Sequence, residues 1–240
     1  MVWAGLVACF LLPGASHSLG SQYPEPLRNK AEIAKAPAET DDIDIRDLPI
    51  EAFSDLKKFP QLKRVRFGNR EGKGATDAKL EALANLALTN VFDVNLLNCP
   101  NVTDNGIRAL AKMKSIKLLG LEGTSISDES VKIISTEMNV TGLNVANCSK
   151  VTFAGLKELS QAKSFKSLGF SADNLTESQV LELLSLLPAS LKELIVVDPA
   201  QKLDKDRVKT SAKERGIKVL VRNTGALQDM LNRGATTRRP

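Results

Sequence analysis

The chain has 240 residues, a formal net charge of +5 and a pI near 9.1, and this length is ample for a buried core. A hydrophobic fraction of 42% and a charged fraction of 25% exclude a wholly disordered or collagen-like chain. Aromatic residues make up 4%, so the core must be built from aliphatic side chains.

The first segment is an uninterrupted apolar run, Val2 to Leu12, followed by Pro13-Gly14. The run is too short for a membrane-spanning helix, which needs about 20 residues, so no membrane span is expected. We predict a signal peptide over 1–18, and therefore a secreted, periplasmic or cell-envelope location. A buried or frayed N-terminal segment is the alternative. A lipid anchor at Cys9 is less favoured, because the apolar run continues beyond it.

Residues 19–42 are polar and proline-bearing, which predicts a flexible linker. The domain predicted to follow, 43–222, contains an internal repeat. Four segments align on Val94, Leu119, Leu143 and Leu168, which are 25, 24 and 25 residues apart, and weaker copies lie on both sides. For residues 223–240 we predict a C-terminal helix and a basic tail.

Each copy begins with alternating apolar and polar residues, which is the period of a half-buried strand. It ends with apolar residues three or four apart, which is helical spacing. One such unit cannot bury its own apolar face, but stacked copies can. The fold class predicted is therefore α/β, with six to seven stacked strand-helix units.

The turns between strand and helix carry a recurring motif. It is clearest in LNCPNVTDNGIRALA, which contains Cys99, Thr103 and Asp104, and in NCSKVTFAGLKELS, which has Phe153 where Asp is expected. The motif resembles that of the leucine-rich repeat family, in its cysteine-containing, ribonuclease-inhibitor-like subtype. The resemblance implies a curved horseshoe with parallel strands on the concave face and helices on the convex face. It also implies a scaffold that binds other proteins.

The motif residues are expected to be structural. Cys99 and Cys148 lie two repeats apart, about 10 Å at the spacing of parallel strands, which is beyond the reach of a disulfide. We expect no metal site and no cofactor, because the chain has no CxxC pair and one histidine, His17, which leaves with the predicted signal. Thr103-Asp104 and Ser127-Asp128 precede helical patterns and are predicted N-caps.

Four Asn-x-Ser/Thr sequences occur, and they would be glycosylation sites only in a eukaryotic secretory pathway. They begin at Asn101, Asn139, Asn147 and Asn174.

The outward strand positions would line the concave face. The face has no aromatic side chains for strong protein anchors or for stacking on bases, so we expect a modest recognition surface and no nucleic-acid partner. The candidate partner-binding residues are Arg64, Arg66, Asp93, Asn95, Glu122, Asn144, Glu193, Ile195 and Val197.

Catalysis is disfavoured, because a mature chain without histidine cannot form a Ser-His-Asp or Cys-His site. The leading hypothesis is a monomeric, non-catalytic, protein-binding scaffold of the cell exterior or envelope. One alternative is a binder of an anionic polymer such as cell-wall glycan, based on the net charge of +5. A second, based on the resemblance, is a substrate-recognition subunit of a ubiquitin ligase, although no F-box-like segment is evident.

Overall fold

The computed structural model describes residues 24–68, 74–162 and 164–224 of the chain. They contain one sheet of eight parallel strands, hydrogen-bonded in the order of the sequence. The strands are β1 (Asp42–Asp44), β2 (Arg64–Arg66), β3 (Asp93–Asn95), β4 (Leu118–Gly120), β5 (Gly142–Asn144), β6 (Ser167–Ser171), β7 (Glu193–Val197) and β8 (Lys218–Arg222).

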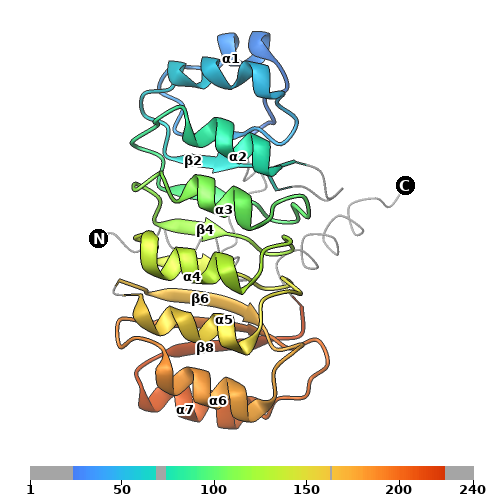
Figure 1. The fold of residues 1–240 in the computed structure, drawn as a ribbon, viewed down its shortest axis with the longest axis vertical. Helices are drawn as coiled ribbons and strands as arrows, with labels where there is room; N and C mark the ends of the chain where they lie inside the picture. Colours follow the sequence, from blue (N-terminus) through green and yellow to red (C-terminus); the bar gives the residue numbers. More distant parts are fainter. Residues whose placement is uncertain (1–23, 69–73, 163, 225–240) are drawn as a thin grey trace, which may run out of the picture.

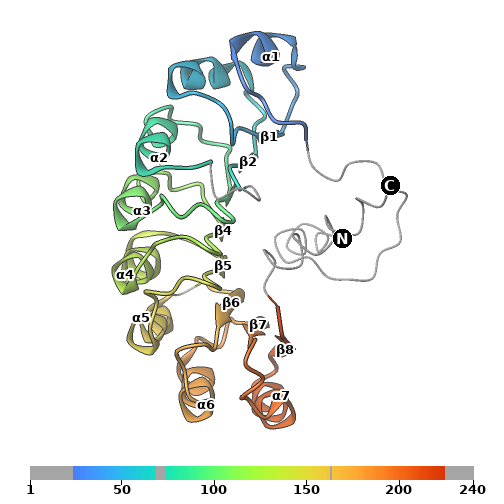
Figure 2. The ribbon, with the colours of Figure 1, turned by 90° about the vertical axis from the view of Figure 1, so that its right-hand side faces the viewer.

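A helix follows each strand from β1 to β7 and returns the chain to the start of the next strand (Figure 1). Figure 2 shows the helices along the outer side of an arc and the strands along its inner side. The helices are α1 (Lys30–Lys35), η2 (Ile50–Lys58), α2 (Asp77–Ala84), α3 (Asp104–Leu110), α4 (Asp128–Glu137), α5 (Phe153–Glu158), η3 (Leu159–Gln161), α6 (Glu177–Leu186) and α7 (Lys205–Glu214).

The core is a stack of aliphatic side chains between the sheet and the helices. The central residues of neighbouring strands are in register, so each covers the equivalent residue of the previous repeat. Seven of the eight are at most 2% exposed, and Val219 of the last strand is partly buried. In register order they are Ile43, Val65, Val94, Leu119, Leu143, Leu168, Leu194 and Val219.

The number of repeats is higher than expected, although the strands span almost the predicted range of 43–222. The structure has eight strand units rather than six or seven, because the copies at Ile43 and Val219 both form paired strands. The predicted linker over 19–42 is also wrong for its described part, which contains α1. Ile33 of this helix is 1% exposed, and Lys58 donates to the carbonyl oxygens of Ala34 and Ala36 at 2.6 and 2.7 Å.

Several predictions fall on residues outside the described ranges: the signal peptide over 1–18 with Cys9 and His17, and the helix and tail after Thr224. Among the residues that the structure describes, no helix has the length and apolar composition needed to cross a bilayer.

Candidate functional site

The strand register places the nine predicted partner-binding residues on one side of the sheet. Arg64, Asp93 and Glu193 occupy the first outward position of their strands. Asn95, Asn144 and Ile195, with Arg66, occupy the next. Glu122 and Val197 lie two residues further along. This side is the concave face, because the alternating strand residues are in the core.

Three of the nine are buried: Asp93 at 7%, Glu122 at 2% and Val197 at 3% exposure. The accessible residues of the predicted set are therefore the two arginines, the two asparagines, Glu193 and Ile195. The sequence pattern predicted the correct side of the sheet. It could not distinguish outward residues that are accessible from outward residues that neighbouring groups bury.

The arginines at the start of the concave face are paired with aspartates. Arg66 donates from Nε and Nη2 to the two carboxylate oxygens of Asp42, at 2.8 and 2.7 Å. The Nε of Arg64 lies 3.7 Å from Asp93, which is too far for a hydrogen bond. The Nε of Arg46 donates to both carboxylate oxygens of the buried Asp44, at 3.0 and 2.8 Å. Two of these three ion pairs, Arg66 with Asp42 and Arg64 with Asp93, cross adjacent strands, whereas the third lies within one repeat. Together they largely neutralise the positive charge of this part of the face.

A second polar cluster lies in the middle of the face. The buried carboxylate of Glu122 accepts hydrogen bonds from the side-chain amides of Asn144 and Asn147, at 3.0 and 3.1 Å. The amide oxygen of Asn144 in turn accepts from the backbone N–H of Ala146 at 3.0 Å. These bonds fix the orientation of the asparagines before any partner binds.

The turns at the carboxyl ends of the strands lead into the helices, and their caps agree with the sequence. The predicted caps Thr103 and Ser127 each accept a bond from the N–H two residues later, at 3.3 Å. Thr152 does the same for α5 at 3.2 Å. Each helix start therefore satisfies one otherwise unpaired backbone donor.

The aspartate after each cap has a role that the sequence did not reveal: it binds the next repeat. Asp104 accepts from the N–H and the hydroxyl of Ser127, at 2.9 and 2.7 Å, and from the hydroxyl of Ser130. Asp77 binds Thr103 equivalently, at 2.8 and 2.6 Å. Burial alone would raise the pKa of Asp104, but the bonds from Ser130 and Ser127 outweigh it and lower the pKa.

Asp128 makes the third link of this kind, to the N–H and hydroxyl of Thr152 at 2.7 and 2.6 Å. We call these three links the aspartate ladder. The glycines of the motif accommodate it: a Cβ on Gly106 would lie 2.6 Å from the carboxylate of Asp77, and one on Gly155 would overlap Asp128. The glycine is thus required by the close approach of a carboxylate from the previous repeat.

The ladder is interrupted between α5 and α6, because Phe153 stands where the aspartate would be. Thr176, the cap of α6, instead pairs with its own helix: its N–H donates to the side-chain oxygen of Gln179 at 2.9 Å. The hydroxyl of Thr176 accepts from the Gln179 N–H at 3.2 Å, which completes a capping box.

The cysteine position changes at the same junction. Cys99 and Cys148 are free buried thiols, each within hydrogen-bonding distance of a carbonyl oxygen of the previous repeat, Phe67 at 3.6 Å and Leu121 at 3.1 Å. Burial raises the pKa of both and brings that of Cys99 to about 11. In the next repeat the equivalent residue is Ala172.

Ala172 takes this place because its carbonyl accepts the same turn hydrogen bond, from the N–H of Leu175 at 2.9 Å, that Cys148 accepts from Val151 at 3.0 Å. Counting the same number of residues forward from the strand gives Asp173 instead, but Asp173 is exposed.

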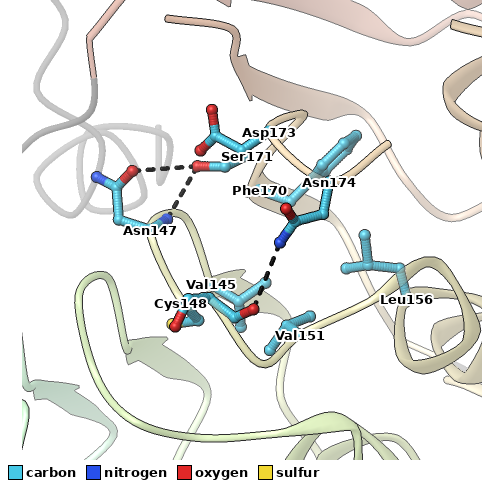
Figure 3. Close-up of a pocket in the computed structure, with 10 residues that line it drawn as sticks. Val145, Asn147, Cys148, Val151, Leu156, Phe170, Ser171, Asp173 and Asn174 are labelled. Carbon is cyan, nitrogen blue, oxygen red and sulfur yellow. Dashed lines mark hydrogen bonds between the residues drawn. The ribbon is translucent and has the colours of Figure 1, made fainter. Parts of the chain in front are cut away.

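A pocket of about 280 Å³ lies at this junction, between the turn after β5 and the turn after β6 (Figure 3). Its apolar lining residues are Val145, Val151, Leu156 and Phe170, and its polar ones are Asn147, Ser149, Ser171, Asp173 and Asn174, with Cys148 beside them. Sequence reasoning did not find this pocket, although the departure from the motif at Phe153 was visible in the sequence.

Two other expectations concern glycosylation and metal binding. The four Asn-x-Ser/Thr asparagines are all exposed, and two of them, Asn147 and Asn174, line the pocket. Within the residues that the structure describes, no group of three or more His, Cys, Asp or Glu side chains is arranged to hold a metal ion.

Comparisons with protein-family profiles and with curated sequences gave no match. Among solved structures, the chain is similar to the leucine-rich repeat-containing protein LegL7 from Legionella pneumophila, with 18% identity, a TM-score of 0.54, and coverage of 78% of this chain and 68% of that one.

Two further structures are more distantly similar. The tropomodulin C-terminal domain of Caenorhabditis elegans has 13% identity, a TM-score of 0.45 and coverage of 57% and 90%. The Rad7 and Elc1 complex of yeast has 11% identity, a TM-score of 0.42 and coverage of 84% and 72%. At these identities the likeness concerns the fold alone. The similarity to LegL7 and the parallel sheet both support this fold. The described part of the chain therefore has the leucine-rich repeat fold, with eight strand units.

Proposed function

We propose that the chain is a non-catalytic scaffold that binds another protein through the concave face of its sheet. The observation that carries this proposal is the composition of that face. Its accessible side chains comprise asparagines and arginines on β2, β3 and β5 that neighbouring groups hold, and the partly exposed apolar residues Ile195 and Leu220 on β7 and β8. Side chains that are fixed before binding lose little entropy in a complex, and exposed apolar groups supply a contact that water disfavours.

A site-specific photo-crosslinking experiment tests the proposal. A photoreactive phenylalanine analogue replaces Ile195 on the concave face, and in a matched variant it replaces Leu186, which is 42% exposed on α6. We expect the concave position to crosslink a discrete partner in the native host and the helix position to give none of that product. Equal crosslinking from the two positions would contradict the proposal.

The absence of catalysis is also a proposal, and the pairing of the carboxylates supports it. Asp42 and Asp44 are bound to arginines, Asp77 and Asp104 hold helix starts, and Glu122 is held by amides. A general acid or base must be free to exchange its proton with a substrate. These carboxylates are engaged in structural bonds instead.

The anionic-polymer alternative has less support. Several lysines at the amino edge of the sheet bind carbonyl oxygens, as Lys114 does with Glu137 at 3.1 Å and Lys192 with Ala189 at 3.3 Å. Such lysines stabilise turns and helix ends. A retention assay on heparin beads distinguishes the hypotheses, because polymer binding would disappear by about 0.5 M salt. The ubiquitin-ligase alternative and the secreted location stay predictions from the sequence.

A further inference from the structure

We propose that the pocket between the fifth and sixth repeats binds an aliphatic side chain that is followed by lysine or arginine in a partner peptide. The proposal deepens the protein-binding function above and rests on it for the nature of the ligand. The site is distinct from the central rows of the concave face, because it lies among the turns at the carboxyl edge of the sheet.

Two structural groups of the repeat are missing at the junction where the pocket lies. Ala172 lacks the sulfur that Cys148 places toward the previous repeat. Phe153 lacks the carboxylate that ties adjacent helix starts together, so Thr176 bonds within its own helix. The space between the two turns is therefore not filled by the groups that fill it at the preceding junctions.

The inner surface of the pocket is apolar and fixed. Val145, Leu156 and Phe170 are at most 2% exposed, and Val151 is 9% exposed. The volume of about 280 Å³ is just below the range of roughly 300–1,000 Å³ that is typical of sites for drug-sized ligands. The pocket therefore suits one aliphatic side chain with part of its backbone, and it is too small for a dinucleotide or a haem.

The rim is rich in hydrogen-bond acceptors. Asn174 spans the opening and donates to the carbonyl of Ser149 at 3.4 Å (Figure 3), which leaves its side-chain oxygen available. Within the described residues, the Asp173 carboxylate makes no hydrogen bond or ion pair, and it is the one charged group of the lining. The nearby Lys202 is directed to the Asp173 backbone carbonyl, at 2.8 Å.

These groups select the ligand. A carboxylate with free acceptors beside it repels phosphates, sulfates and acidic side chains and attracts an ammonium or guanidinium group. The amide oxygen of Asn174 accepts a backbone N–H, which a peptide supplies next to its apolar side chain. A peptide in which a basic residue follows an aliphatic one can pack its aliphatic side chain against the apolar inner surface and pair its basic side chain with Asp173 at the rim.

Three short peptides test the proposal directly on the full chain: acetyl-Leu-Arg-amide, acetyl-Leu-Glu-amide and acetyl-Gly-Arg-amide. The readout is the NMR shift of the methyl groups of Val145, Val151 and Leu156 during titration. We expect saturable shifts with Leu-Arg, at least threefold weaker binding of Leu-Glu, and no saturable shift with Gly-Arg. Absence of shifts with every peptide, or equal binding of all three, would overturn the proposal.

Three variants test whether the interaction takes place in the pocket. Asp173→Lys changes an exposed residue and should reverse the preference, so that Leu-Glu binds more tightly than Leu-Arg. Glu182→Lys makes the same charge change on the outer side of α6 and should leave the preference unchanged. Val151→Phe should abolish binding by filling the pocket, provided that its circular dichroism spectrum matches the parent. An unaltered preference in Asp173→Lys would overturn the role of the carboxylate.

The outcome is independent of the crosslinking test. Peptide binding without a concave-face crosslink would uphold the pocket and reject the proposed docking face. A concave-face crosslink without peptide binding would do the reverse.

Discussion

The junctions between successive repeats differ in how their helix starts are joined. From α2 to α5, the aspartate ladder links each helix to the next through a carboxylate that binds a backbone N–H and a hydroxyl. Between α5 and α6 that carboxylate is absent, and the cap is satisfied inside its own helix. The strand register nevertheless continues without a break across this junction.

The difference shows that the fold needs each helix start to be satisfied but does not need the link between repeats. A local capping box serves the backbone as well as a carboxylate from the neighbour does. Where a helix start is capped by its own residues, the two neighbouring turns do not need to lie close enough for a carboxylate of one to bind the other. The pocket lies at the junction with this property.

Removal of one ladder carboxylate gives the largest expected effect. Asp104→Ala leaves the Ser127 N–H and two hydroxyls without their acceptor, and we expect the free energy of unfolding to fall by about 3 kcal/mol. Urea unfolding followed by circular dichroism measures the change. Asp173→Ala, at the junction without a ladder, is the matched control and should cost less than about 0.5 kcal/mol. Equal losses would mean that the ladder does not stabilise the repeats.

The two cysteines allow a comparison of the same junctions by chemical labelling. Burial raises the pKa of Cys99 to about 11, so its thiolate fraction at pH 8 is about two orders of magnitude below that of a free thiol. We expect iodoacetamide to label Cys99 at least a hundredfold more slowly in the native chain than in guanidinium chloride, measured by peptide mass spectrometry.

Cys148 lines the pocket and is 6% exposed, against 0% for Cys99. Native labelling of Cys148 should therefore be the faster of the two. Faster labelling of Cys99 would indicate that the junction around Cys99 opens more readily than the junction that contains the pocket.

The ladder also predicts a dependence on pH. The pKa of Asp104 is lowered in the folded chain, so between this value and the unfolded value of about 3.9 the unfolded state binds more protons. The stabilisation is present above pH 3.9 and is lost as the pH falls through the folded pKa. The stability difference between the parent and Asp104→Asn should thus shrink from pH 5 to pH 2.5 in urea unfolding. A constant difference would exclude the ionised carboxylate as the stabilising group.

The parts of this architecture that a sequence can predict are those that repeat. The spacing of Val94, Leu119, Leu143 and Leu168 predicted the strand stack, and Thr103 and Ser127 were correctly predicted as caps. The partner of Asp104 was not predictable in the same way, because it depends on how closely two helix starts approach in space.

The pocket was missed because of a shift in alignment. Counting forward from the strand gives Asp173 as the equivalent of the cysteine, but the turn is one residue shorter and the buried position is Ala172. The burial of Asp93 and Glu122 was missed for a related reason, since strand alternation predicts a side of the sheet and not what covers it.

Restoring the missing sulfur should have a smaller effect. Ala172→Cys places a thiol near the Val145 carbonyl, in the position that Cys148 has near Leu121. We expect a gain of up to about 1 kcal/mol in unfolding free energy, since buried volume is filled and a weak donor finds an acceptor. Binding of acetyl-Leu-Arg-amide should weaken as the pocket narrows. A loss of stability would show that this junction is already fully packed.

Restoring the missing carboxylate is expected to change stability least. Phe153→Asp would add an acceptor for Thr176 and a favourable charge at the start of α5. It would also remove the ring over which the Lys157 ammonium lies, 4.7 Å from the centroid. Because Gln179 already satisfies Thr176, the new bonds replace existing ones, and the net change should stay below about 1 kcal/mol.

A double-mutant cycle tests whether the new carboxylate replaces the hydrogen bonds of the Gln179 capping box or adds to them. Gln179→Ala alone removes the capping box and should cost about 1 kcal/mol. In the Phe153→Asp background the same substitution should cost much less, because the carboxylate takes over the Thr176 N–H and hydroxyl. Coupling of this sign means that the two devices are alternatives for one helix start. Additive losses would mean that the carboxylate introduced by Phe153→Asp does not reach Thr176.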